Sequence, residues 1–240
     1  MLSFDNVSLT YRGGAGVQDL ALTIAPGEIV ALVGLNGAGK TTLMRLALGL
    51  LQPAVGVVRL FGHPLPTVPD ALWRHLGHLI DTPLAYPELT VRDNLRIAGL
   101  LREADPRCAD VSLRHWNLQS FAQRRVRRLS LGNRQRVSLS AALQHAPRVI
   151  VLDEPSNTLD PAAVIILRDL LVQRAREGAA VLVSSHHLDE VARIADRILV
   201  MNAGRLIGEL DPGSSELERA FFEKVRQDDA ACTSTIETRS

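Results

Sequence analysis

The feature that most constrains the fold is a glycine-rich loop, GLNGAGKT at residues 34–41, set between an apolar strand and a helix. Residues 27–34, which precede it, form a nearly continuous apolar run, typical of a strand buried on both faces of a parallel sheet. Residues 39–51, which follow, repeat leucine and alanine with the spacing of an amphipathic helix. Strand, glycine turn and helix in this order predict one unit of an α/β fold.

The loop matches the pattern G-x-x-x-x-G-K-[ST], which holds phosphate groups when it lies between a strand and a helix. Glycines let the backbone curl so that successive N–H groups point at phosphate oxygens. Lys40, one of only two lysines in the chain, supplies a positive charge, and the Thr41 hydroxyl is a ligand suited to Mg²⁺. We weigh this against a chance glycine-rich turn and favour the phosphate site, because both flanking elements are present. The predicted nucleotide-binding residues of the loop are Gly34, Leu35, Asn36, Gly37, Ala38, Gly39, Lys40, Thr41 and Thr42.

Charged side chains follow two other apolar runs. Asp153 and Glu154 end the run VIVLDEP at residues 149–155, and His186 ends AAVLVSSH at residues 179–186. Ligands of open α/β sheets bind beyond the carboxyl ends of the strands. We predict that Asp153 holds Mg²⁺, that Glu154 orients or deprotonates an attacking water, and that His186 rather than His187 acts beside it. The alternative is an acidic turn and a surface histidine.

The remaining patterns complete the predicted fold. Residues 4–11 and 17–24 alternate like antiparallel strands, and residues 197–210 return to strand patterns. Helices are expected over residues 161–177 and 187–195, and residues 82–145 form a mostly helical insert in which Thr90 caps a helix. The proline-rich residues 64–90 read as loops around one short helix, and the polar residues from 228 read as a frayed tail. We therefore expect one domain over residues 1–210, then a C-terminal helix and flexible tail over residues 211–240.

A second loop, LSLGN at residues 129–133, follows the basic run RRVRR and opens an amphipathic segment. A serine hydroxyl and the free N–H groups of a helix start are suited to an anion. The basic run is more often a solvated face than a nucleic-acid site, and the net charge of +1 gives no strongly basic surface. No run approaches the roughly 18 apolar residues of a membrane span, and the first residues lack a signal pattern, so we expect a cytoplasmic location.

Five motifs follow one another in this order: GLNGAGKT, LSLGN, VIVLDEP, SNTLDP and SSH. With these motifs, residues 1–210 resemble the ATP-binding subunits of ABC transporters. The resemblance implies a P-loop NTPase core with a mostly parallel sheet, an N-terminal antiparallel β-subdomain and an inserted α-helical subdomain. It implies ATP and Mg²⁺ as ligands, and ATP hydrolysis coupled to transport. It also implies that two copies pack head to tail, as a homodimer, and that each lends its signature loop to the ATP of the other. That loop consists of Ser130, Leu131, Gly132 and Asn133.

Further roles follow from the resemblance alone. Tyr11 would stack on adenine, and Asn157 and Asp160 of SNTLDP would link the two sites across the dimer interface. AYPELTVRDNL at residues 85–95 would lie where a separate membrane permease docks, which would place the chain on the inner face of the cell membrane. The plain alternatives are an aromatic at a strand end, a polar helix cap and a loop-to-helix connection.

The chain departs from the family pattern at three positions. Leu131 replaces the commonest glycine of the signature loop, Asn133 replaces glutamine, and Asp81 stands where most members have a glutamine that reaches Mg²⁺. Asp81 is shorter and charged, so it either binds the metal directly or falls short. These departures resemble the subgroup of bacitracin-type and lantibiotic-type exporters, with general drug exporters as a close second. Two other functions stay open: an ABC-type ATPase acting on nucleic acid or ribosomes, and a regulatory ATP sensor.

Overall fold

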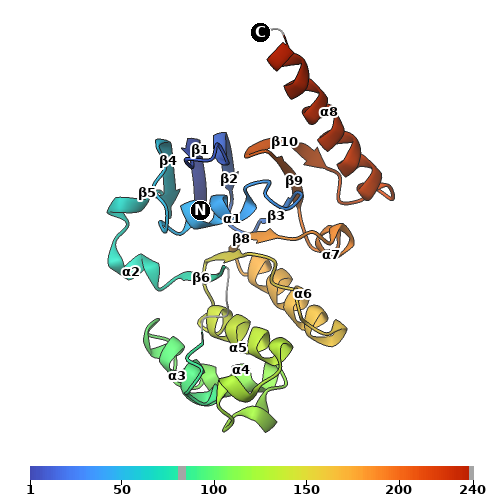
Figure 1. Ribbon diagram of the computed structural model, residues 1–240. Coiled ribbons are helices and arrows are strands. Elements are labelled where there is room, and N and C mark those ends of the chain that lie inside the picture. Colours follow the sequence, from blue (N-terminus) through green and yellow to red (C-terminus); the bar gives the residue numbers. More distant parts are fainter. Residues whose placement is uncertain (81–84, 238–240) are drawn as a thin grey trace.

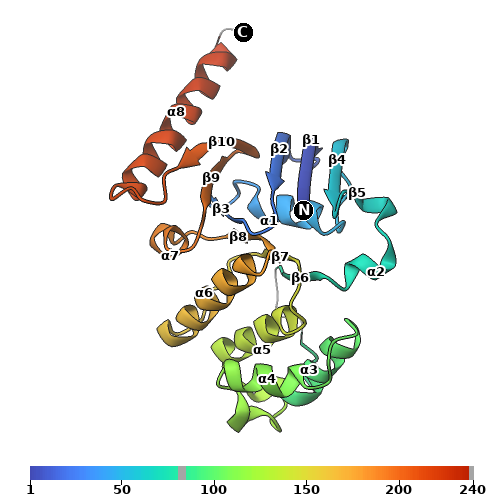
Figure 2. The same ribbon diagram turned by 180° about the vertical axis from the view of Figure 1, so that it is seen from behind.

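The computed structural model describes residues 1–80 and 85–237 as two β-sheets with a lobe of helices beneath them (Figure 1). The same three parts are seen from behind in Figure 2, with the C-terminal helix extending away from the sheets. This arrangement confirms the predicted α/β class, with its antiparallel subdomain and its helical insert.

The N-terminal sheet is antiparallel and has the strand order β2-β1-β4-β5. It consists of β1 Leu2–Thr10, β2 Gly16–Ile24, β4 Val55–Leu60 and the two-residue β5 His63–Pro64. Leu2 pairs with Ile24 on one side and with Leu60 on the other, so that these three buried side chains start one face of the sheet. The alternating pattern of residues 4–11 and 17–24 therefore predicts β1 and β2 correctly, since one face of the sheet is buried.

The central sheet has the strand order β10-β9-β3-β8-β7-β6. Its strands are β3 Ile29–Val33, β6 Leu76–Leu79, β7 Val149–Leu152, β8 Ala180–Ser184, β9 Arg197–Asn202 and β10 Arg205–Leu210. All pairings are parallel except the β9–β10 hairpin. Every residue of β3, β7 and β8 is buried, as the unbroken apolar runs predict for strands covered on both faces.

Helices cover the central sheet and form the lower lobe in Figure 1. The bounds are α1 Lys40–Ala47, α2 Asp70–Trp73, α3 Val91–Leu100, α4 Cys108–His115, α5 Leu131–Leu143, α6 Pro161–Arg176 and α7 Leu188–Ala192, with short 3₁₀ turns at Leu65–Thr67, Gln119–Phe121 and Val126–Arg128. Thr90 caps α3 as predicted, because its hydroxyl oxygen accepts a hydrogen bond from the Asp93 N–H at 3.1 Å.

Strand β6 was not predicted, since residues 64–90 read as loops around one short helix. The strand has only four residues, and glycine and histidine stand in its middle. Its form comes from tertiary pairing, because Leu76 to Leu79 lie in register with Val149 to Leu152 of β7. A Cβ on Gly77 would lie 2.4 Å from the Ala142 carbonyl oxygen, so glycine at this position lets α5 pack directly on the strand.

The C-terminal helix α8, Leu217–Glu237, is longer than expected, because it continues through residues that read as a frayed tail. Asp228 and Asp229 lie in this stretch, and both accept hydrogen bonds from the Asn202 amide, at 2.9 and 2.8 Å. Arg205 also bonds Asp228. Asn202 of β9 and Arg205 of β10 thus hold the polar stretch of the helix against the sheet. Composition alone does not show these contacts. The division of the chain at residue 210 stays a prediction.

The helical lobe contains a buried polar pair that tests this packing. The hydroxyls of Ser112 on α4 and Ser140 on α5 lie 2.6 Å apart, and both residues are buried. Ser140→Ala leaves the Ser112 hydroxyl buried without that partner, so we expect a loss of about 1 to 3 kcal/mol in the free energy of unfolding. The Ser112→Ala/Ser140→Ala double variant removes both hydroxyls and should lose less than the sum of the two single variants. Urea denaturation measures all four proteins, and strictly additive losses would contradict the pairing.

Candidate functional site

The glycine-rich loop lies between β3 and α1, as predicted. Leu35, Asn36 and Gly37 are exposed, whereas Gly34 and Ala38 are buried. Gly34 has no room for a side chain, because a Cβ would lie 2.4 Å from the Met201 carbonyl oxygen. Gly39 has a φ of +106°, a backbone conformation that glycine adopts at no steric cost. Close packing on β9 and a left-handed turn together fix the curl of the loop.

Lys40 opens α1, and its ammonium group turns back into the loop. The nitrogen Nζ donates to the Gly34 carbonyl at 2.7 Å and lies 3.9 Å from Oε1 of Glu154. The side chain is only 8% exposed, so this charge lies inside the curl of the loop and not on the surface. A cation held there beside backbone N–H groups is placed to attract the outer phosphates of a nucleotide.

Asp153 follows β7 and joins the ends of two other elements. Its Oδ2 accepts a hydrogen bond from the Thr41 hydroxyl at 2.6 Å, and its Oδ1 accepts one from the Ser184 hydroxyl. Thr41 stands in α1 and Ser184 ends β8, so a single carboxylate connects the loop with two strand ends. A carboxylate and a hydroxyl in contact are the hard oxygen donors that Mg²⁺ prefers, and the predicted metal ligands therefore fit that ion.

Glu154 points from the same strand end toward His186. Its Oε2 lies 2.7 Å from Nδ1 of His186 and accepts a bond from the His186 backbone N–H at 3.2 Å. Its own N–H donates to the Ser184 hydroxyl at 2.8 Å. The φ of Glu154 is +47°, which a non-glycine residue adopts only at some cost in energy. The structure thus brings together Lys40, Thr41, Asp153, Glu154 and His186 at the carboxyl ends of neighbouring parallel strands.

Ser184 is a member of this cluster that the sequence reasoning did not single out. It is fully buried, and it bonds both Asp153 and the backbone of Glu154. A signal was present, because Ser184 opens the SSH motif that contains His186. A serine at a strand end is common, however, and only the register of β8 beside β7 shows that its hydroxyl reaches both acids.

The signature loop lies at the start of α5, in the lower lobe and apart from α1 in both views (Figures 1 and 2). Ser130 caps the helix, since its hydroxyl oxygen accepts a bond from the Asn133 N–H at 3.3 Å. Leu131 is 58% exposed. A Cβ on Gly132 would lie 2.7 Å from the Thr158 carbonyl oxygen, so this loop packs closely on the segment that follows Glu154. At the helix start Ser130 and Leu131 are thus exposed, and Gly132 and Asn133 are partly exposed.

The SNTLDP segment connects the strand ends to this lobe. Asp160 caps α6 by accepting a bond from the Ala163 N–H at 2.9 Å, and it forms an ion pair with Arg136 of α5. The Ala163 N–H, helped by Arg136, holds the pKa of the Asp160 carboxyl below its usual value. The Gln135 amide donates to the Pro155 carbonyl at 3.0 Å. The segment thus caps α6, which is one of the two roles predicted for it. The other, a link across the dimer interface, stays a prediction.

Three further predicted residues are placed as follows. Tyr11 directly follows β1, and its ring is 40% exposed, so a flat ligand has access to it. Asn157 lies in the SNTLDP turn, where its N–H donates to the Glu154 carbonyl at 3.2 Å. Asp81 lies outside the described residues, and its role as a metal ligand stays a prediction.

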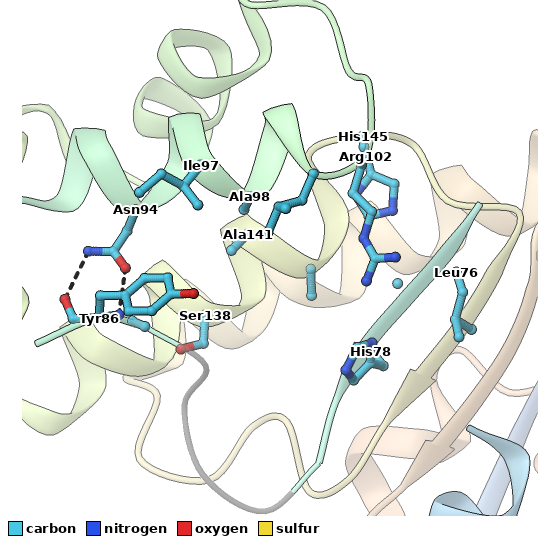
Figure 3. A pocket seen from close by; sticks show the side chains of 14 residues that line it. Leu76, His78, Tyr86, Asn94, Ile97, Ala98, Arg102, Ser138, Ala141 and His145 are labelled. Carbon is cyan, nitrogen blue, oxygen red and sulfur yellow. Dashed lines mark hydrogen bonds between the residues drawn. The ribbon is translucent and has the colours of Figure 1, made fainter. Parts of the chain in front are cut away.

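A groove of about 640 Å³ lies between the helical lobe and β6 (Figure 3). Its walls are apolar side chains of α3 and α5, including Ile97, Ala98 and Ala141. Part of the predicted docking segment, residues 85–95, borders it: the Asn94 amide bonds the backbone N–H and carbonyl of Tyr86, at 2.7 and 3.1 Å. This hydrogen-bonded pair holds the segment against the start of α3.

The opposite end of the groove carries one positive charge, on Arg102, beside two histidines. Arg102, His78 and His145 line it, and Figure 3 shows the guanidinium of Arg102 between the two imidazole rings. Burial lowers the pKa of His145 to about 4, and the charge of Arg102 acts in the same direction, opposed by a contact with the Leu76 backbone. Burial, and again Arg102, lower the pKa of His78. Sequence reasoning missed this cluster, because its members come from separate elements.

A glycine-rich loop between a strand and a helix, two carboxylates at a neighbouring strand end and an inserted helical lobe define a P-loop ATPase cassette. The ABC transporter family model matches residues 17–157. The chain therefore belongs to the ABC transporter family and is an ATP-binding subunit with an ATPase domain.

Relatives and solved structures agree with this assignment. The chain is 35% identical over 236 residues to the uncharacterized ABC transporter ATP-binding protein YhcH of Bacillus subtilis (strain 168), covering 96% of this chain and 77% of that protein. It is 35% identical to the bacitracin transport ATP-binding protein BcrA of Enterococcus faecalis, over 88% of this chain and 69% of that protein. A solved ATP-binding subunit of an ABC transporter superposes with a TM-score of 0.82 at 28% identity, covering 94% of each chain. A dimeric bacterial ABC transporter cassette, MJ0796, superposes at 0.80 with 25% identity, over 89% of this chain and all of that one.

Among residues 1–80 and 85–237, no helix has both the length and the apolar character needed to cross a membrane.

The lowered pKa of His145 gives a pH prediction. The unfolded imidazole titrates near its ordinary value of about 6.5. The folded one titrates at about 4. Between these values the unfolded chain binds more protons, so stability is fully present above about pH 6.5 and is lost as the pH falls toward 4. Between about pH 7 and about pH 5, this histidine lowers the free energy of unfolding by roughly 1 to 2 kcal/mol. We expect His145→Gln to remove that part of the pH dependence. Urea denaturation measures this, with the exposed His63→Gln as control, and equal pH dependence in wild type and His145→Gln would contradict the assignment.

Proposed function

We propose that this subunit hydrolyses ATP to drive a separate membrane permease that exports a drug or a peptide antibiotic. The contact of Glu154 with His186, beside the Lys40 ammonium and the Thr41–Asp153 pair, is the observation that carries the chemistry. The cluster combines a cation for phosphates, oxygen donors for a metal and a carboxylate that is free to accept a proton.

The phosphate groups of ATP lie in the loop of residues 34–42, and the adenine stacks on Tyr11. Lys40 attracts the outer phosphates, while Thr41 and Asp153 supply oxygen atoms to Mg²⁺, with Asp81 as a further ligand. When bound, Mg²⁺ supplies charge stabilisation for the phosphates. Ser184 holds the two acids after β7 in place, since its hydroxyl donates to the Asp153 carboxylate and accepts a bond from the Glu154 N–H.

Glu154 orients the attacking water and accepts its proton, as the water oxygen bonds to the terminal phosphorus and the bond to the ADP oxygen breaks. The products are ADP and inorganic phosphate. His186 holds the Glu154 carboxylate through two hydrogen bonds, one from its backbone and one at Nδ1. Half of the His186 side chain is exposed, so its other ring nitrogen is available to a phosphate oxygen.

Two copies of the chain enclose two ATP molecules, and each signature loop completes the site of the other copy. Support comes from the exposed residues at the start of α5, a helix that lies apart from α1 of its own chain (Figure 1). Ser130 and the N–H groups near Gly132, Leu131 and Asn133 bond the γ-phosphate of the facing copy. Asn157 and Asp160 lie between the two sites. The related cassette MJ0796 is dimeric, which is consistent with this arrangement.

The permease docks in the groove beside residues 85–95 and holds the subunit at the inner face of the membrane. Export as the direction of transport is supported by relatives whose names are bacitracin transport ATP-binding protein and Nod factor export ATP-binding protein. The groove offers an apolar wall, formed by side chains of α3 and α5, against which an amphipathic helix packs.

Two other functions are less favoured by the site. A nucleic-acid ATPase would need the basic run, but Arg125 and Arg127 both pair with Glu88, at 3.4 and 3.2 Å, and Arg124 stacks over Phe121. A regulatory ATP sensor that hardly turns ATP over would not need the Glu154–His186 pair. ATPase activity that rises on reconstitution with the permease favours transport, whereas binding that weakens steeply with salt would favour nucleic acid.

Glu154→Gln tests the proposed hydrolysis. The amide keeps the size of the side chain but no longer accepts a proton, so we expect retained ATP binding, a loss of at least about a hundredfold in kcat, and accumulation of an ATP-bound dimer. Phosphate release and size-exclusion chromatography with ATP measure these effects, with Glu177→Gln on the surface as control. Hydrolysis by Glu154→Gln at the wild-type rate would show that Glu154 is misassigned.

Ser130→Arg tests whether the signature loop serves the facing copy. A long cation at the start of α5 blocks that surface, so we expect unchanged ATP affinity of the monomer and no dimer with ATP. The affinity is measured by fluorescence with a labelled nucleotide, and the dimer by chromatography in the Glu154→Gln background. If the monomer itself loses ATP, the loop acts within its own subunit.

A further inference from the structure

We propose that the groove between α3, α5 and β6 receives a permease helix carrying an aspartate or glutamate, whose carboxylate pairs with Arg102 and His78. The proposal rests on the proposed docking of a permease and adds the chemistry by which this chain recognises its partner.

The shape of the groove suits a helix. Small side chains, Ala98 on α3 and Ala141 and Ala142 on α5, line one wall and allow another backbone to approach closely. Leu101, 73% exposed, extends the apolar surface at the edge of the groove. An exposed apolar surface beside a hollow of about 640 Å³ is typical of a protein interaction site.

The charge of the groove is not balanced within the part of the chain that the structure describes. Among the described residues, Arg102, His78 and His145 line this end of the groove, and no aspartate or glutamate outside residues 81–84 does so. Arg102 donates one hydrogen bond, from Nη1 to the Trp73 carbonyl at 2.9 Å, and the neighbouring Glu103 pairs with Arg74 instead. Arg102 is partly buried, and this burial lowers the pKa of its guanidinium.

The histidine beside it also offers hydrogen-bonding capacity. Nδ1 of His78 is buried and has no hydrogen-bond partner among the described residues. A carboxylate beside the Arg102 guanidinium forms a charge-assisted hydrogen bond that replaces the water lost on burial. The same carboxylate favours the protonated form of His78, whose ring N–H then donates to the carboxylate. A buried cation without a carboxylate is costly, so the pairing adds to affinity and selects partners that carry an acid at this point.

A free phosphate is the less favoured occupant, because the greater part of the groove is apolar and Arg102 is the only arginine or lysine among its described lining residues. A helix that presents one carboxylate among apolar side chains complements both the apolar part of the groove and the end that carries Arg102.

The test uses the full-length subunit and the permease encoded in the same operon, purified together in detergent, with affinity measured by biolayer interferometry. We expect Arg102→Glu to weaken binding at least about tenfold. Arg96→Glu, the same charge reversal at an exposed position of α3, should bind within about twofold of wild type. Changing one Asp or Glu of a cytoplasmic permease helix to Arg should restore the affinity of Arg102→Glu. Each variant is first checked by thermal melting.

A second variant separates this proposal from the docking that it rests on. Ala98→Trp fills the groove without changing its charge. If Ala98→Trp loses binding but Arg102→Glu binds as wild type does, the permease docks there without an acidic anchor, and the proposal is wrong. Loss of binding by Arg102→Glu that no permease charge reversal restores also overturns it. If Ala98→Trp binds as wild type does, the docking site itself is misplaced and the anchor fails with it.

Discussion

The hydrogen bond from the Thr41 hydroxyl to Asp153 joins two segments that lie 112 residues apart in the sequence. The Asp153 carboxylate also receives the Ser184 hydroxyl, so the ends of β7 and β8 and the start of α1 meet at one side chain. Such a contact forms only when parallel strands are already in register, because their carboxyl ends must lie at one edge of the sheet. The chemistry of the site therefore depends on non-local strand pairing.

The same sheet edge is connected to the helical lobe by few but specific contacts. The Asp153 N–H donates to the Leu79 carbonyl at 2.8 Å, and Leu79 ends β6, the strand that carries His78 into the groove. From the other side, the Gln135 amide holds the Pro155 carbonyl, and Arg136 pairs with Asp160. The strand that borders the groove is thus hydrogen-bonded to Asp153, and the signature helix is bonded to the segment that follows Glu154. A rotation of the lobe moves both connections together.

Sequence reasoning predicted the parts of the site that depend on local pattern. The loop around Lys40 and the acids after β7 stand next to unbroken apolar runs, whose burial in a parallel sheet follows from their composition. Strand β6 was missed, because four residues containing glycine and histidine have no strand pattern without their partner. Ser184 was missed as a positioning residue, and the length of α8 was underestimated, for the same reason. Each depends on a contact between segments far apart in the chain.

The left-handed backbone of Glu154 has a consequence for the evolution of the protein. A non-glycine residue at positive φ costs about 1 kcal/mol, which glycine or asparagine at this position would largely relieve. The chain keeps the carboxylate and bears this cost. If Glu154 has the proposed catalytic role, selection for heat resistance that replaces it with glycine or asparagine would give a more stable protein that no longer hydrolyses ATP at its original rate.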